Sequence, residues 1–139
     1  ILPPLAEFYK SFFLAYYQDK YAAEGRKVKS VSIVINTWHY KNGGYQQRGY
    51  REPNGVGARL SQHKLGNGFD CDIIIVFEDG ERLEADYVEI HKVILENEQL
   101  FISKGLSAIE DVKIAKTWLH SDCRWIPNQN KILIVKPRR

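Results

Sequence analysis

The sequence predicts one α+β domain across residues 1–139, with a mainly antiparallel sheet and flanking helices. Periodic segments follow one another as helix, strands, helix, strands, rather than in the regular alternation of a parallel α/β fold. The length of 139 residues suits one hydrophobic core. The composition, 44% hydrophobic and 27% charged, is ordinary for a globular chain.

The first helix is predicted for residues 4–22, where apolar side chains recur at intervals of three and four. These side chains are Leu5, Phe8, Phe12, Phe13 and Tyr16. Pro3 and Pro4 stand where a helix can begin. The next segment, Val31–Trp38, alternates in polarity and is rich in β-branched residues, which predicts a strand.

Residues 39–69 follow neither period, and glycine and proline interrupt them repeatedly. A loop of about thirty residues is uncommon in a compact domain and is usually functional when it is ordered. The segment Phe69–Phe77 then has the apolar, β-branched composition of a strand. The turn Glu78–Gly80 closes that strand.

A second helix is predicted to begin at Asp86, with Glu89 in its first turn. Its apolar face carries Tyr87, Ile90, Ile94 and Phe101. Three short strands are expected after it, around Leu106, over residues 117–124 and over residues 131–136.

Charge, hydropathy and cysteine spacing argue against several classes of function. The net charge of +3 is too small to predict a nucleic-acid partner, and the short basic tail at residues 136–139 reads as solvated. No apolar stretch approaches the ~20 residues of a membrane span. Cys71 and Cys123 lack the spacing of a zinc knuckle or a redox motif.

The first chemical motif is Ser-Gln-His-Lys-Leu-Gly-Asn-Gly-Phe-Asp at residues 61–70. It places His63 and Asp70 seven positions apart, with two glycines between them that allow the backbone to fold back. Imidazole nitrogen and carboxylate oxygen are both good zinc ligands. Spacing alone nevertheless favours a loop histidine and a turn aspartate.

The second motif is Trp-Leu-His-Ser-Asp-Cys-Arg at residues 118–124. Strand alternation predicts one face that carries Trp118, His120, Asp122 and Arg124. Such a face is either exposed to solvent or part of a site. By the same alternation, Cys71 and Cys123 are expected on the opposite face, as small buried apolar groups.

Together these segments resemble zinc peptidases of the D-alanyl-D-alanine carboxypeptidase/hedgehog type. That family carries Ser-x-His-x-x-Gly-x-Ala-x-Asp and, far downstream, Trp-x-His or a similar motif. The matching positions of the first motif are Ser61, His63, Gly66 and Asp70, with Gly68 in place of the alanine. His120 matches the third ligand, and Gly49–Pro53 is similar to the Gly-Tyr-Arg-Ser-Pro segment of the family.

The resemblance implies a zinc site held by His63, Asp70 and His120, with the fourth position left to water. Zinc acidifies such a water to a pKa of about 7 and polarises the scissile carbonyl. Arg51 would bind the substrate carboxylate or the developing oxyanion. A surface arginine in a turn is an equal alternative for Arg51.

The chain departs from the family at the general base. Many relatives place a glutamate three residues before the last histidine ligand, and others a histidine two residues before it. Thr117 and Trp118 occupy these positions. Asp122 is therefore the predicted base, with Glu110 and Asp111 next. The competing role for Asp122 is to orient the ligand histidine or to pair with an arginine.

The function predicted is hydrolysis of peptides that contain D-amino acids, most naturally peptidoglycan stem peptides, in a bacterium or a phage. A periplasmic, cell-wall or phage-associated location fits that function. One alternative is a non-catalytic, zinc-containing peptidoglycan-binding module of the same fold. Another is a small polyanion-binding domain without metal. His39 and His91 are expected to be surface or half-buried residues, not ligands.

Overall fold

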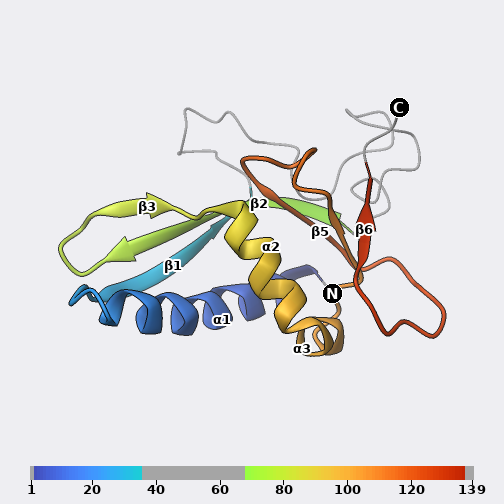
Figure 1. The fold of residues 1–139 in the computed structure, drawn as a ribbon, viewed down its shortest axis with the longest axis horizontal. Coiled ribbons are helices and arrows are strands. Elements are labelled where there is room, and N and C mark those ends of the chain that lie inside the picture. The colour runs from blue at the N-terminus through green and yellow to red at the C-terminus, as the bar shows by residue number, and fades with distance from the viewer. Residues whose placement is uncertain (1, 36–67, 137–139) are drawn as a thin grey trace.

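The computed structural model describes residues 2–35 and 68–136 (Figure 1). Within these ranges three helices accompany a six-stranded, mostly antiparallel sheet, which confirms the α+β class. In chain order the elements are α1 (Leu2–Ala22), β1 (Val28–Val34), β2 (Gly68–Phe77), β3 (Arg82–Glu84), α2 (Tyr87–Glu96), α3 (Glu98–Ser103), β4 (Ala108–Glu110), β5 (Leu119–Asp122) and β6 (Leu133–Val135).

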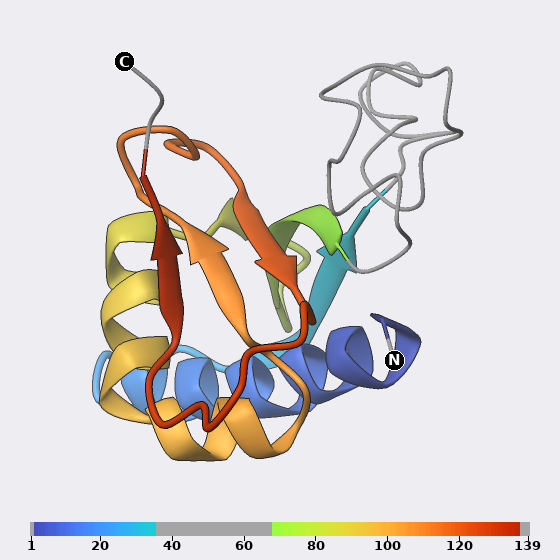
Figure 2. The same ribbon diagram turned by 90° about the vertical axis from the view of Figure 1, so that its right-hand side faces the viewer.

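The strands of the described part are ordered β1-β2-β5-β4-β6, and β3 also pairs with β2. All pairings are antiparallel except that of β4 with β6. β2 is the longest strand and joins the two halves of the sheet. Its first residues pair with β5 and its later residues with β3. Figure 2 shows β6, β4 and β5 side by side, with β2 and β1 beyond them.

The predicted turn after β2 is confirmed. Gly80 has a φ of +91°, in the left-handed region that favours glycine, and its N–H donates to the carbonyl of Phe77. The chain then returns as β3, so residues 68–84 form a hairpin. The sequence indicated the turn but not this short second strand.

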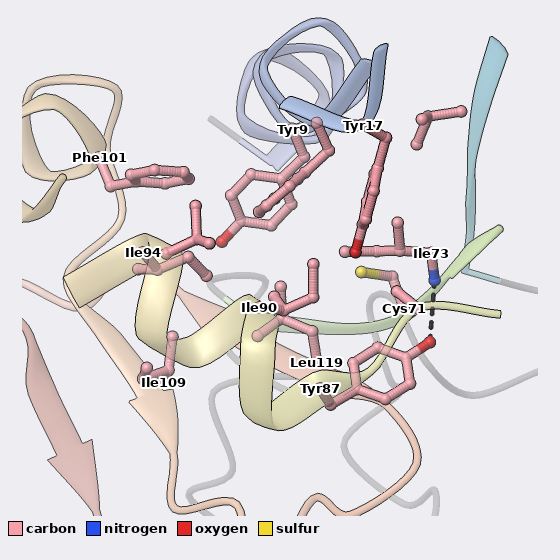
Figure 3. Packing of buried hydrophobic residues seen from close by; sticks show 14 of the residues in the cluster. Tyr9, Tyr17, Cys71, Ile73, Tyr87, Ile90, Ile94, Phe101, Ile109 and Leu119 are labelled. Carbon is pink, nitrogen blue, oxygen red and sulfur yellow. Dashed lines mark hydrogen bonds between the residues drawn. The ribbon is translucent and has the colours of Figure 1, made fainter. Parts of the chain in front are cut away.

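The helix α1 forms as predicted and packs one face on the sheet, but only Leu5 and Phe13 of the predicted face are fully buried. Phe8, Phe12 and Tyr16 are partly buried at its edge. The fully buried face consists of Leu5, Tyr9, Phe13 and Tyr17, which recur every four residues. Figure 3 shows Tyr9 and Tyr17 of α1 converging with Ile90 and Ile94 of α2 and with Leu119 of β5. One core therefore lies between the helices and one face of the sheet.

The second helix begins as predicted, because the Asp86 carboxylate accepts hydrogen bonds from the N–H groups of Val88 (3.0 Å) and Glu89 (3.5 Å). The expectation of one helix reaching Phe101 was wrong. The helix breaks at Asn97, whose side-chain amide donates to the carbonyl of Val93 at 2.8 Å. This local hydrogen bond competes with the helical pattern, and α3 starts directly afterwards.

Side chains alternate across β2 and β5. Cys71 and Leu119, which lie opposite each other in register, are fully buried in the core. The Ser121 hydroxyl is hydrogen-bonded to the Tyr9 hydroxyl of α1 at 2.6 Å. Cys123 packs against the same core, and burial raises the pKa of its thiol to about 11. Both cysteines lie on the helix-covered side, as predicted, although Cys123 is only partly buried.

Candidate metal centre

Three neighbouring strands place one polar side chain each in a row on the sheet face that points away from the core. Asp70 of β2 is the register partner of His120 of β5. On the other side of β5, Ala108 and Ile109 pair with Asp122 and Ser121, which brings Glu110 beside His120. Side chains that are directly opposite in a sheet have Cβ atoms about 4.5–5.5 Å apart. The strand register therefore assembles the group.

The three side chains converge on one nitrogen of His120. Its Nδ1 lies 2.7 Å from Oδ1 of Asp70 and 3.3 Å from Oε1 of Glu110. One ligand atom from each residue lies within 4.8 Å of the other two. The His120 side chain is 6% exposed, against 13% for Asp70 and 22% for Glu110, so the group opens on the carboxylate side.

The donor set fits a divalent metal ion. One imidazole nitrogen and two carboxylate oxygens are ligands that zinc takes in proteins. Two ligand atoms placed tetrahedrally around zinc, at bond lengths of ~2.0–2.1 Å, are about 3.3 Å apart. The distance between Nδ1 of His120 and Oε1 of Glu110 has this value. Asp70, Glu110 and His120 could therefore hold a metal ion once the shorter contact of 2.7 Å between Asp70 and His120 opens.

The same arrangement binds a proton in the metal-free protein. Burial alone would lower the pKa of His120. Hydrogen bonds to Asp122 and Asp70, together with the charges of Asp70 and Glu110, outweigh burial and raise this pKa to about 9. A metal ion at Nδ1 would have to take the place of that proton, because only a neutral imidazole ligates.

The other ring nitrogen of His120 faces a second, fully buried carboxylate. Nε2 donates to Oδ2 of Asp122 at 3.2 Å. Arg124 donates through Nε to Oδ1 at 2.8 Å and through Nη2 to Oδ2 at 2.7 Å. Burial would raise the pKa of the Asp122 carboxyl, but the hydrogen bonds from His120 and Arg124 outweigh it and hold the pKa below its usual range.

Two of the residues predicted from the sequence as ligands, Asp70 and His120, lie side by side. The third predicted ligand, His63, and the predicted oxyanion-binding residue, Arg51, lie outside the described residues. Asp122 lies on the ligand face of β5, where alternation placed it. Its Oδ2, however, contacts Nε2 of His120, the nitrogen that does not contact Asp70.

From the sequence Glu110 is only the next candidate for the base after Asp122, whereas the structure places it in the metal-binding group. No local signal in a three-residue strand could show this, because its position depends on the β4–β5 register. His91 lies buried on α2 and is not part of the metal-binding group found among residues 2–35 and 68–136. Burial lowers the pKa of His91, although the charge of Asp111 acts in the opposite direction. His39 lies outside the described residues.

Comparison of the chain with protein-family models, with curated proteins and with solved structures gave no match. None of the helices in the described ranges has the length and apolar character that crossing a membrane requires.

Proposed function

We propose that the chain is a zinc metallopeptidase of the D-alanyl-D-alanine carboxypeptidase/hedgehog type. Its proposed substrates are peptides that contain D-amino acids, most naturally peptidoglycan stem peptides. The main support for this proposal is the contact between Oδ1 of Asp70 and Nδ1 of His120, at 2.7 Å. The sequence motifs assign these two residues, 50 positions apart, as ligands of one metal. Strand register independently makes them neighbours.

Asp70 and His120 would hold the zinc ion together with His63. Bound zinc supplies a Lewis acid that polarises the scissile carbonyl and acidifies a water molecule. Arg51 remains the proposed partner of the substrate carboxylate or of the developing oxyanion.

Two carboxylates compete for the role of general base. The sequence favoured Asp122, but both of its oxygens already accept hydrogen bonds from His120 or Arg124. Glu110 is more exposed and reaches the nitrogen of His120 that Asp70 also contacts. Geometry comes before pKa in choosing a base. We therefore assign Glu110 as the general base that takes the proton of the attacking water. In this role Glu110 replaces Asp122.

Zinc content and peptide hydrolysis test this proposal together. The full chain, purified without chelators, should carry about one zinc per chain and hydrolyse a stem peptide ending in D-alanine. Asp70→Ala and His120→Ala should lose stoichiometric zinc, whereas the matched histidine variant His91→Ala should keep it. Glu110→Gln should keep zinc and lose a factor of ~10² to 10⁴ in rate. Hydrolysis by the His120→Ala variant at the unmutated rate would refute the assignment.

The non-catalytic module is the second candidate, and the position of Glu110 favours it in one respect. If Glu110 ligates the metal in addition to His63, Asp70 and His120, four protein ligands close the site, as in structural zinc centres. Such a protein would bind stem peptides and zinc without hydrolysis. Tight zinc binding in a chain that hydrolyses no stem peptide would select this alternative. About one zinc per chain would exclude the metal-free polyanion-binding domain.

A further inference from the structure

The side chain of Asp122 is fully buried on the face of β5 that carries His120. Its register neighbours are Gly68 on β2 and Ala108 on β4. Neither neighbour has a polar side-chain atom, so the carboxylate takes its side-chain hydrogen bonds along its own strand. A buried, unpaired carboxylate would be very costly. The cation that compensates Asp122 is Arg124, two residues further on.

Arg124 holds the carboxylate in one orientation. Nε and Nη2 of the guanidinium donate to different oxygens of Asp122, at 2.8 and 2.7 Å. This two-pronged pairing is the strong and directional form of an arginine–carboxylate contact. The Arg124 backbone N–H also approaches Oδ1, at 3.4 Å. Rotation of the carboxylate would break both guanidinium contacts, so its direction relative to His120 is fixed.

The fixed carboxylate determines which nitrogen of His120 faces the metal-binding group. Oδ2 of Asp122 accepts from Nε2 of His120 at 3.2 Å, which gives the Nε2 proton a permanent acceptor. In a neutral imidazole the lone pair is then on Nδ1, and Nδ1 faces Asp70 and Glu110. The partner of one ring nitrogen commonly sets the tautomer and the direction of a ligand histidine.

We propose that Asp122, clamped by Arg124, is a positioning residue that presents Nδ1 of His120 to the metal. Asp122 acts through the histidine and does not itself contact substrate. The inference deepens the proposed function in that it rests on a metal at this site, but it is independent of whether the protein hydrolyses peptides. Loss of such an orienting partner typically lowers metal affinity by 10- to 100-fold.

The test compares zinc affinity, by competition with a chelator, for the full chain and for Asp122→Ala, Arg124→Lys and the double variant. Asp122→Ala should lose ~10- to 100-fold in affinity. Arg124→Lys should lose less, because lysine keeps the charge but not the two-pronged geometry. Arg124 acts only through Asp122, so the double variant should bind no more weakly than Asp122→Ala.

A second arginine–carboxylate pair provides a matched control. Arg26 and Glu81 are 3.0 Å apart, and neither belongs to the metal-binding group. Arg26→Lys and Glu81→Ala should leave zinc affinity unchanged. The ring nitrogens supply a readout that does not depend on any variant. Correlation of ring protons with ¹⁵N in the zinc-loaded chain should show the proton of His120 on Nε2 and the metal on Nδ1.

Unchanged zinc affinity in Asp122→Ala would overturn the inference, as would zinc on Nε2 of His120. Normal zinc affinity with a rate lowered by ~10² to 10⁴ would make Asp122 the general base, and the peptidase would stand without this inference. If the variants show the expected order of zinc affinities but the unmutated chain hydrolyses no peptide, the proposed peptidase activity is wrong and the positioning role of Asp122 stands. If Asp122→Ala does not fold, the zinc affinity of Arg124→Lys and the ring-nitrogen measurement decide whether Asp122 positions His120.

Discussion

The two faces of the central strands differ in what they contribute to the protein. On the helix-covered face, Phe69, Cys71 and Leu119 join the aromatic core. On the other face, Asp70, His120 and Asp122 form a chain of ion pairs. These residues alternate along the same two strands, so one register fixes both the core and the site.

The core and the site depend on different interactions. The helix-covered face is stabilised by the burial of apolar area, which is non-directional and large in total. The polar face holds charges that are costly to bury, and each of them is compensated by a specific neighbour. Substitutions on the first face should therefore change the free energy of unfolding, and substitutions on the second should change metal binding.

The largest effect is expected in the core. Phe101 is fully buried and contacts the rings of Phe8, Tyr9, Phe12 and Phe13. Phe101→Ala should lower the free energy of unfolding by ~3–5 kcal/mol, measured with denaturant in the presence of a chelator. Its neighbour Leu100 is 42% exposed, and Leu100→Ala should cost much less. A similar loss in both variants would contradict the assignment of Phe101 to the core.

A substitution at Ser121 tests whether the two faces of β5 act independently, because Ser121 lies between His120 and Asp122 but faces the core. Ser121→Ala leaves the buried hydroxyl of Tyr9 without its 2.6 Å partner. The expected cost is ~1–3 kcal/mol of unfolding free energy, with zinc affinity unchanged. The double variant Tyr9→Phe with Ser121→Ala should be more stable than Ser121→Ala alone, since it removes both polar groups. A fall in zinc affinity in Ser121→Ala would show that the two faces are coupled.

The sequence predicted the elements that have a strong period. Apolar residues at intervals of three and four predicted α1, although not the burial of Tyr9 and Tyr17. Alternation correctly separated Leu119 and Ser121 from His120 and Asp122. Asp70 and His120 were predicted together from a family resemblance, because residues 50 positions apart share no local pattern.

The place of Glu110 beside Asp70 and His120 and the helix break at Asn97 were missed for related reasons. β4 has only three residues, too few to show a period, and its position beside β5 is a tertiary property. The break falls at Asn97, where a side-chain hydrogen bond to Val93 competes with the helical pattern, and composition does not reveal such a bond. The contacts of Asp122 could not be predicted from the sequence either. Alternation gave its face but not the nitrogen of His120 that it contacts.

The polar face also contributes a pH dependence to the stability of the metal-free protein. The pKa of His120 is raised in the folded, metal-free protein from about 6.5, its ordinary value, to about 9. The stability that this imidazolium contributes is fully present below pH ~6.5 and is lost as the pH rises through about 9. In chelator, the free energy of unfolding should therefore fall over this window by at most ~1.4 kcal/mol per pH unit. His120→Gln should flatten the profile, whereas His91→Gln, on the helix-covered side, should not. A flat profile in the unmutated protein would mean that Asp70, Asp122 and Glu110 do not hold the charged ring in solution.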